Sequence, residues 1–344
     1  MAWEEKDWRS VAKLDWNEAS SETTEGVKTA LIEFIKNGRI NWYPDTDNAK
    51  LRQALSRYCS VDVSNVQYFN SSDALHENII DTFCVEGQPS LIVTPTYDQF
   101  RSLSESRGLT TNQFKLTHEY EIDFASLEKE IEQLKPKIIY ICNPNNPTGT
   151  LHDRQRLVEL IQNNNNVLFL IDEAYFEFGG YTLADKVDTL DNLVISRTFS
   201  KAFGLASLRI GYAISCEENI SALNKVRNPK HTSAMAQVAA LAALEDLSGM
   251  EHYAKEVQEL KLKVPALLTD LNIEFVLGGG NFFLLKMDEK MKKEFMKQAQ
   301  KNNIFIRNLS HLPDFKKYCR ITLGNNSQIT KVIDILKEII QKNE

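Results

Sequence analysis

The sequence predicts an α/β protein in which a mainly parallel, doubly wound sheet is followed by a second, smaller α+β domain. Between residues 48 and 216, short apolar runs alternate with segments of helical periodicity. Runs that are apolar throughout indicate strands buried on both faces, which is typical of parallel sheets covered by helices. After residue 230 the pattern changes to long helical stretches and two further strands, which indicates the second domain.

Six strands are expected in the first part of the chain, each a short apolar or β-branched run beside a helical pattern or a turn. In chain order they are VQYF (66–69), LIVT (91–94), KIIYIC (137–142), VLFLI (167–171), NLVIS (192–196) and RIGYAIS (209–215). Helical spacing follows the first run at Leu75, Ile79 and Phe83. The run NNNN at 163–166 marks the end of a helix and the loop into the next strand.

The second domain is expected to begin with helices over 232–247 and 251–271, the second kinked or broken at Pro265. NIEFVLGGGNFFLLKM then predicts a hairpin-like pair of strands, and SQITKVIDILKEIIQ predicts a final helix. The apolar residues of that helix share one face and are predicted to be core: Ile329, Val332, Ile333, Leu336, Ile339 and Ile340.

The length of 344 residues is enough for two domains. We expect an N-terminal segment over 1–40 that packs on the small domain, a large domain over 41–230, and a small domain over 231–344.

Charge and composition exclude several classes of partner. The 40 basic and 47 acidic residues are spread along the chain, so we expect neither nucleic acid nor a membrane as a partner. The N-terminus does not read as a signal peptide, and no apolar run is long enough to span a bilayer, so we expect a cytoplasmic protein. The five cysteines are far apart without a CxxC pair, and we predict no metal site.

Polar residues follow several predicted strands, at the edge of the sheet where ligands of doubly wound folds bind. NSSDA opens a helix after VQYF, so it is either a phosphate site or an ordinary cap. NPNNPTG follows KIIYIC and is too rich in proline to continue the strand, so this turn presents Asn146 rigidly. DEAYFEF places Asp172 at the end of a buried strand, where a carboxylate needs a cationic partner.

The stretch SRTFSKAFGLASLRIGY at 196–212 crowds hydroxyls, two arginines and a lysine among small apolar residues. It is either a solvated loop or a site for an anionic ligand. Each of these motifs alone could be a cap, a turn or a structural ion pair. Together they provide an amine, a carboxylate and donors for a phosphate dianion, which is the set that pyridoxal 5'-phosphate chemistry requires.

The chain resembles the fold-type I pyridoxal-phosphate aminotransferases, and within them the histidinol-phosphate aminotransferase branch, nearly from end to end. The motifs NPNNPTG, DEAY and SKxxGLxxxRxGY are highly specific in this order and spacing. The resemblance implies a large domain with a mainly parallel seven-stranded sheet sandwiched by helices. The full set of matching segments is KLDWNE (13–18), NWYPDTDNAKLRQAL (41–55), NSSDA (70–74), PTYDQF (95–100), NPNNPTG (143–149), DEAY (172–175), RTFSKAFGLASLRIGY (197–212) and YCRITLG (318–324).

The resemblance implies that pyridoxal 5'-phosphate is the cofactor and that Lys201, Asp172 and Tyr175 are catalytic. Lys201 is expected to hold the cofactor through its amine and to act as general base once displaced, while Asp172 pairs with the ring nitrogen. Asn146 and Tyr175 are expected to bond the ring hydroxyl oxygen, and Tyr97 to stack on the ring. The implied phosphate-binding residues are Ser72, Asp73, Ala74, Thr198, Ser200 and Arg209.

Two further implications concern the partner subunit and the substrate. Tyr43 corresponds to a tyrosine that reaches the cofactor phosphate of the neighbouring subunit, which implies a homodimer. Arg320 is expected to clamp a substrate carboxylate or phosphate, since a guanidinium binds such groups with two parallel hydrogen bonds, and Asn17 to lie on the substrate side. Arg307 is either a contact for a second anionic group or a surface residue.

The implied reaction exchanges an amino group between an amino acid, with glutamate as the expected donor, and a 2-oxo acid or phosphorylated keto compound. A phospho-amino-acid decarboxylase of the threonine-phosphate decarboxylase type is the alternative with the same cofactor. A ligand-sensing protein that retains the fold is the non-catalytic alternative.

Two segments depart from the family pattern. NEASSETTEG lacks the proline and the aromatic residue that usually follow Asn-Glu, and FNSSDA has Ser71 and Ala74 in place of glycine and glutamate. The first departure concerns the substrate, and the second concerns the geometry of the phosphate loop.

Overall fold

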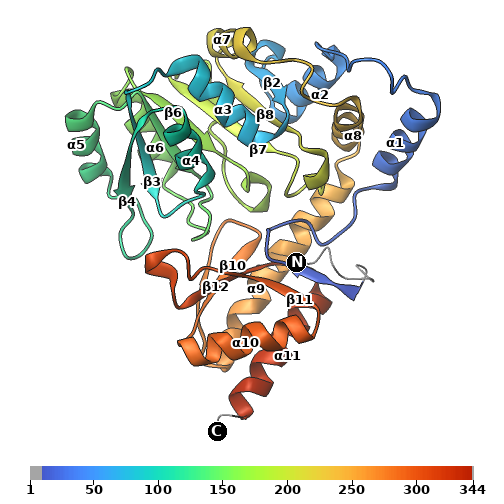
Figure 1. The fold of residues 1–344 in the computed structure, drawn as a ribbon, viewed down its shortest axis with the longest axis vertical. Coiled ribbons are helices and arrows are strands. Elements are labelled where there is room, and N and C mark those ends of the chain that lie inside the picture. The colour runs from blue at the N-terminus through green and yellow to red at the C-terminus, as the bar shows by residue number, and fades with distance from the viewer. Residues whose placement is uncertain (1–9, 343–344) are drawn as a thin grey trace.

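The structure is a computed structural model that describes residues 10–342, and it contains two sheets, one in each half of the molecule (Figure 1). The large sheet has seven strands in the order β2-β8-β7-β6-β5-β3-β4. All neighbours are parallel except β8, which runs antiparallel to both β2 and β7. The predicted mainly parallel sheet is therefore confirmed. Its strands are β2 (Val66–Phe69), β3 (Pro89–Thr94), β4 (Thr110–Lys115), β5 (Ile138–Cys142), β6 (Leu168–Asp172), β7 (Leu193–Thr198) and β8 (Gly211–Ser215).

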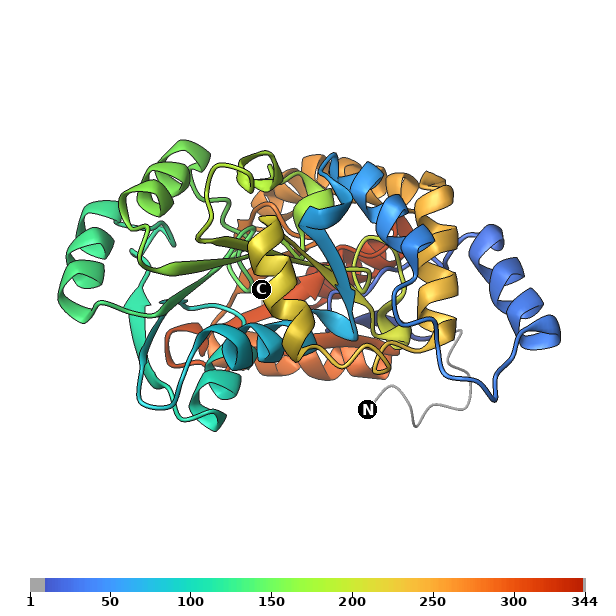
Figure 2. The same ribbon diagram turned by 90° about the horizontal axis from the view of Figure 1, so that it is seen from above.

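Helices cover both faces of the large sheet, as Figure 2 shows from above. One face packs against α3 (Ser71–Phe83), α4 (Gln99–Ser106) and α7 (Glu217–Val226). The other face packs against α2 (Ala49–Cys59), α5 (Phe124–Leu134), α6 (Arg154–Asn163) and α8 (Ala234–Glu245). This sandwich buries the central strands completely, which explains their unbroken apolar sequences.

The edge strand β4 was not among the six strands expected from apolar runs. Its sequence is TTNQFK, and its residues are exposed or half-buried. Because β4 pairs only with β3, one edge faces solvent, and a continuous apolar sequence is not required there.

The small sheet has five strands in the order β1-β11-β12-β10-β9. The predicted hairpin is confirmed, since β9 and β10 pair antiparallel. Pro265 lies inside α9, which continues on both sides of it, so the helix is not broken there. The elements are β1 (Ala12–Leu14), α9 (Ser248–Asp270), β9 (Glu274–Leu277), β10 (Phe282–Lys286), α10 (Glu289–Lys301), β11 (Ile304–Asn308), β12 (Tyr318–Thr322) and α11 (Asn326–Gln341).

The N-terminal segment contacts both halves of the molecule. β1 adds a parallel strand beside β11, whereas α1 (Glu25–Asn37) packs on α8. The alanines of α8 belong to the same hydrophobic core as the large sheet. The domain limits at residues 40 and 230 stay a prediction, and residues 1–9 of the first segment lie outside the described part.

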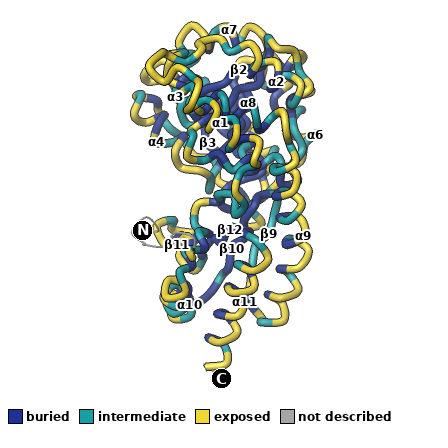
Figure 3. Tube along the Cα trace, turned by 90° about the vertical axis from the view of Figure 1, so that its right-hand side faces the viewer, coloured by how far each residue is buried: buried dark blue, intermediate teal, exposed yellow. Residues whose placement is uncertain are grey.

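Burial follows the two sheets, with buried residues gathered at the strands of each (Figure 3). The predicted core face of α11 is buried at Ile329, Val332, Ile333, Leu336 and Ile339. No helix within residues 10–342 has both the length and the apolar character needed to cross a membrane. Short 3-10 turns complete the fold at Val63–Asn65, Phe176–Phe178, Ala184–Lys186, Ala206–Leu208 and Pro313–Phe315.

Candidate active site

Asp172 marks the centre of the polar edge of the large sheet, because β6 is the middle one of the seven strands. It is the last residue of β6 and is 3% exposed. The hydroxyl of Tyr140 donates to its Oδ2 at 2.8 Å, and the backbone N–H of Ala174 donates to its Oδ1 at 3.2 Å. Within residues 10–342 this carboxylate forms no ion pair. A buried carboxylate of this kind is suited to a cationic group on a ligand.

Lys201 follows β7 and directs its amine to the same region. Its Nζ donates to the carbonyl of Trp16 at 2.8 Å and lies 5.9 Å from the ring centroid of Tyr175. Burial, with a smaller contribution from the positive charge of Arg320, lowers the pKa of Lys201 to about 8. Its amine is therefore neutral in a larger fraction of molecules than an ordinary lysine, which suits a nucleophile and proton carrier.

The start of α3 and the start of β8 approach each other very closely. A Cβ atom on Gly211 would lie 2.7 Å from the backbone N of Ser72 and 2.8 Å from the carbonyl of Arg197, so no side chain fits there. Ser71 has a left-handed φ of 83°, and its hydroxyl accepts from the backbone N–H of Ala74 at 3.2 Å. In this structure the Ala74 donor is thus already used within the loop.

Polar side chains surround this helix start. Arg209 donates from Nη2 to Asp73 Oδ2 at 3.1 Å and from Nη1 to Ser200 Oγ at 3.5 Å. Thr198 Oγ1 donates to Ser200 Oγ at 3.0 Å, and Tyr97 OH donates to Asp73 Oδ1 at 3.2 Å. The structure therefore brings together four residues predicted for the phosphate, namely Asp73, Thr198, Ser200 and Arg209, and the charge of Asp73 is offset by Arg209.

A second polar group lies where the two sheets meet. Asn146 donates from Nδ2 to Tyr175 OH at 3.2 Å and accepts from Arg320 Nη1 at 2.6 Å. Arg320 also donates from Nη2 to the carbonyl of Asp15 at 2.7 Å, while its buried Nε has no partner in the described chain. Burial lowers the pKa of Arg320, and the adjacent positive charge of Arg307 adds to this effect. Arg307 and Arg320 lie directly opposite each other on the neighbouring strands β11 and β12.

The predicted substrate residue Asn17 is buried in the same place and donates from Nδ2 to Tyr175 OH at 3.1 Å. Tyr43 is different: it is 77% exposed, and Lys230 lies 4.7 Å from its ring centroid. Within residues 10–342 no hydrogen bond, ion pair or ring contact joins it to the site residues named above. Its exposure is compatible with the predicted role at a partner subunit, which stays a prediction.

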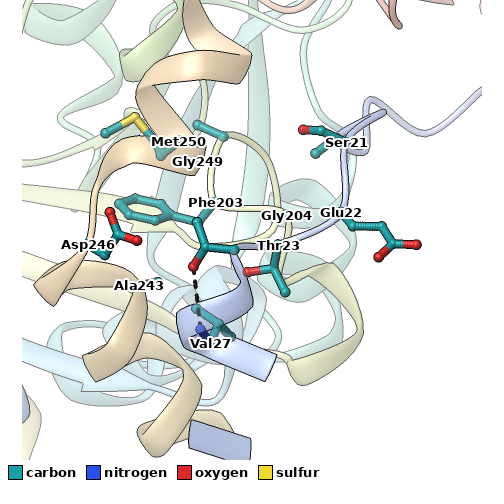
Figure 4. Close-up of a pocket in the computed structure, with 13 residues that line it drawn as sticks. Ser21, Glu22, Thr23, Val27, Phe203, Gly204, Ala243, Asp246, Gly249 and Met250 are labelled. Atoms are coloured by element: carbon teal, nitrogen blue, oxygen red, sulfur yellow. Dashed lines mark hydrogen bonds between the residues drawn. The ribbon is translucent and has the colours of Figure 1, made fainter. Parts of the chain in front are cut away.

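Two cavities border the site without containing the Lys201 amine. One has a volume of about 560 Å³ and runs from Tyr97 and the ends of β3 and β4 to Leu312 and Phe315. That volume lies in the range of small-molecule sites. The other lies behind the turn after Lys201, between Phe203, Gly204 and the segment from Ser21 to Val27 (Figure 4). Its volume of about 10 Å³ leaves room for no more than one water.

Two supporting features were missed in the sequence. Tyr140 was assigned only as a strand residue, although a hydroxyl in the aliphatic run KIIYIC is a signal for a buried polar partner. Glu173 and Arg197 form a buried ion pair at 2.8 Å, next to Asp172 and Thr198. The guanidinium of Arg197 also lies 3.9 Å from the ring centroid of Phe176. The sequence did contain a signal for this ion pair, because an acidic and a basic residue follow two consecutive apolar runs.

The donor set fits pyridoxal 5'-phosphate. Among the described residues Asp172 has no cationic partner, and such a buried carboxylate matches a protonated ring nitrogen, while Lys201 provides an amine of lowered pKa. Arg209, Thr198 and Ser200 converge with the start of α3 on one spot, which matches a phosphate dianion. These residues would hold the cofactor between the large sheet and Tyr97.

Comparisons with known proteins agree with this chemistry. The model of the family "Aminotransferase class I and II" matches residues 9–336. The dihydroxyacetone phosphate transaminase Cj1437c of Campylobacter jejuni is 42% identical over 348 residues, which cover 98% of this chain and 93% of the relative. The histidinol-phosphate aminotransferase of Thermoanaerobacter sp. strain X514 is 32% identical over 329 residues, covering 95% of this chain and 93% of the relative.

Among solved structures, the histidinol-phosphate aminotransferase of Sinorhizobium meliloti in complex with pyridoxal-5'-phosphate superposes with a TM-score of 0.88 at 24% identity. The superposition covers 97% of this chain and 92% of that one, and it shows the same fold. Sequence, fold and donor set lead to one conclusion: the chain belongs to the class I and II aminotransferases and is a pyridoxal 5'-phosphate-dependent transaminase close to the histidinol-phosphate aminotransferase branch.

Proposed function

We propose that this enzyme transfers the amino group of glutamate to a small phosphorylated ketone, with dihydroxyacetone phosphate as the first candidate. The observation that carries the proposal is the pair Arg307 and Arg320, which lie opposite each other on β11 and β12. Neither forms an ion pair with a carboxylate of the described chain. Two adjacent guanidinium groups without acidic partners favour a dianionic ligand over a monoanion.

The N-terminal segment and the similarity to known relatives both favour a small acceptor. NEASSETTEG lacks the aromatic residue that commonly faces the substrate in the family, so a ring on the acceptor would lose a packing partner. The 42% identity to a dihydroxyacetone phosphate transaminase exceeds the 32% identity to a histidinol-phosphate aminotransferase. Both observations support a compact acceptor without an imidazole ring.

The proposed roles of the side chains follow from their contacts. The bound cofactor supplies the electron sink that stabilises negative charge at the reacting carbon. Lys201 anchors it covalently, and the freed Nζ then carries the proton at the reacting carbon. Asp172 holds a proton on the ring nitrogen, and Tyr175 donates to the ring oxygen. Arg320 orients an acidic group of the substrate.

The remaining proposed contacts complete the cofactor site. Arg209, Thr198, Ser200 and the N–H groups at the start of α3 bind the phosphate. Tyr97 packs on the ring. A homodimer brings the partner's copy of Tyr43 to the same phosphate, which accounts for an exposed aromatic at this position and for the exposed neighbours Ile40 and Trp42.

The test is a coupled assay with the cofactor-loaded enzyme, L-glutamate and either dihydroxyacetone phosphate or imidazole acetol phosphate. We expect multiple turnovers with the first acceptor, each giving one 2-oxoglutarate and one 2-amino-3-hydroxypropyl phosphate, and a lower kcat/KM with the second. A higher kcat/KM for imidazole acetol phosphate would overturn the proposed acceptor. Release of carbon dioxide from a phospho-amino acid without any oxo acid product would establish the decarboxylase alternative.

A further inference from the structure

Asn17 is held by the small sheet through three of its four polar atoms. It is fully buried and has a left-handed φ of 57°. Its backbone N–H donates to Thr322 Oγ1 at 3.0 Å, and its side-chain Oδ1 accepts from the same hydroxyl at 3.2 Å. Its carbonyl accepts from Asn281 Nδ2 at 3.2 Å. These contacts orient the side-chain amide without any group of the large sheet.

The fourth polar atom reaches the large sheet. Asn17 Nδ2 donates to Tyr175 OH at 3.1 Å, and Asn146 Nδ2 donates to the same oxygen at 3.2 Å. A phenolic hydroxyl accepts at two positions and donates one proton. Both acceptor positions are therefore filled, and the proton of Tyr175 has no acceptor among residues 10–342.

The two donors differ in what holds them. Asn146 is fixed by Arg320 at 2.6 Å, so a substrate anion on Arg320 competes with this contact. Asn17 is fixed by Thr322 and Asn281, which are both fully buried. Its hydrogen bond to Tyr175 therefore does not depend on the state of the substrate clamp.

We infer that Asn17 is a positioning residue that keeps the phenolic proton of Tyr175 directed at the ring oxygen of the cofactor, rather than a residue that contacts substrate. The inference rests on the proposed role of Tyr175. Thr322 and Asn281 hold the N–H, the carbonyl and Oδ1 of Asn17, and one Nδ2 hydrogen is directed at Tyr175, so the contacts of this residue serve Tyr175 before any other group. The N-terminal segment thus acts on the cofactor through Tyr175.

The test is a pH titration of the visible absorption of the loaded enzyme without donor or acceptor, so it does not depend on the identity of the substrates. Donation by Tyr175 stabilises negative charge on the ring oxygen, which weakens proton binding at the nitrogen joined to Lys201. Asn17→Ala removes one of the two bonds that orient Tyr175, and we expect the midpoint to rise by about half a pH unit. Asn17→Asp replaces a donor by an acceptor of the phenolic proton, so we expect a larger rise.

Asn192 offers a matched control, since it is buried and donates to three backbone carbonyls of Ile161, Asn164 and Val167 away from the site. Asn192→Ala should lose stability without moving the midpoint. An unchanged midpoint in both Asn17 variants, with a raised KM, would overturn the inference in favour of a substrate contact. A rise in Asn17→Ala that persists undiminished in a Tyr175→Phe background would overturn it as well.

Thr322→Val provides a second variant if the Asn17 substitutions do not fold. It keeps the shape of the side chain and removes the hydroxyl that orients the Asn17 amide. We expect a rise of the same sign and smaller size. No shift in Thr322→Val, with normal folding and cofactor content, would contradict a positioning role.

Discussion

The cofactor side and the substrate side of this site are held by different kinds of contact. On the cofactor side, the polar groups follow strands β5, β6 and β7, whose backbone register places Cys142, Asp172 and Ser196 in one row. On the side where Arg320 would bind substrate, Arg320, Asn146 and the positioning residue Asn17 come from three distant parts of the chain. Side-chain hydrogen bonds join them, and those of the two asparagines meet at Tyr175 OH. The first arrangement depends on the sheet, whereas the second depends on how the two halves of the molecule meet.

This difference indicates how each side can vary. Register in a buried sheet is strongly specified, so the ring and phosphate contacts tolerate little change. Side chains that meet between two sheets can be exchanged with smaller consequences for the fold, and they can therefore adapt to different substrates. The predictions below test each side separately.

The largest expected effect is on the cofactor side, at Lys201. Lys201→Ala removes both the proposed covalent anchor and the proposed proton carrier, so we expect kcat/KM for transamination to fall by about a thousandfold or more. Lys261 is a matched control, because burial lowers its pKa to about 8 as well while its Nζ donates to the carbonyl of Phe178 instead. Lys261→Ala should retain turnover. Equal losses in both variants would contradict the assignment of Lys201 as the catalytic amine.

Much of the cofactor side could be predicted from the sequence, because its residues follow apolar runs directly and the register of parallel strands brings their ends together. Asp172, Thr198 and Lys201 are examples. The edge strand β4 could not be predicted in this way, since its exposed sequence TTNQFK carries no apolar run. The hydrogen bond from Asn17 to Tyr175 joins residues 158 positions apart, and no local pattern encodes such a contact.

The next largest effect concerns stability at the same edge. Glu173 is fully buried and pairs with Arg197, so Glu173→Gln leaves a buried guanidinium without its counter-charge. We expect the free energy of unfolding to fall by about 3 to 5 kcal/mol, measured by denaturant titration at a fixed cofactor concentration.

The exposed pair Arg154 and Asp185 serves as the control, because its groups are solvated. Asp185→Asn should cost less than about 1 kcal/mol. Comparable losses for the buried and the exposed pair would show that Glu173 and Arg197 do not stabilise the cofactor edge.

On the substrate side, Arg307→Met should affect the acceptor and leave the cofactor unchanged. Removal of one charge-assisted contact is expected to raise KM for a phosphorylated acceptor by about 10- to 100-fold. The half-reaction with glutamate and the absorption spectrum should stay as in the wild type. Arg156→Met, at another exposed arginine, is the control for loss of surface charge. An unchanged KM for every phosphorylated acceptor would make Arg307 a surface residue.

The smallest effect is expected at Tyr140. It tests whether this residue changes the affinity of the polar edge for the cofactor. Tyr140 is buried, stacks on Phe100 at 4.6 Å and donates to Asp172. In Tyr140→Phe the cofactor-free protein leaves the Asp172 carboxylate with one donor fewer, which costs about 1 kcal/mol. The loaded protein loses less, because the proton on the ring nitrogen supplies a donor to the same carboxylate. The cofactor should therefore bind several-fold more tightly in the variant.

Tyr68→Phe removes a buried hydroxyl bonded to the carbonyl of Asp45, away from Asp172, and provides the comparison. It should destabilise the free and the loaded protein equally and leave the cofactor dissociation constant unchanged. Equal losses of stability in the free and loaded forms of Tyr140→Phe would contradict the tuning role. Tyr140 would then only fill space beneath the cofactor, and the polar edge of the sheet would act on the ring through Asp172 alone.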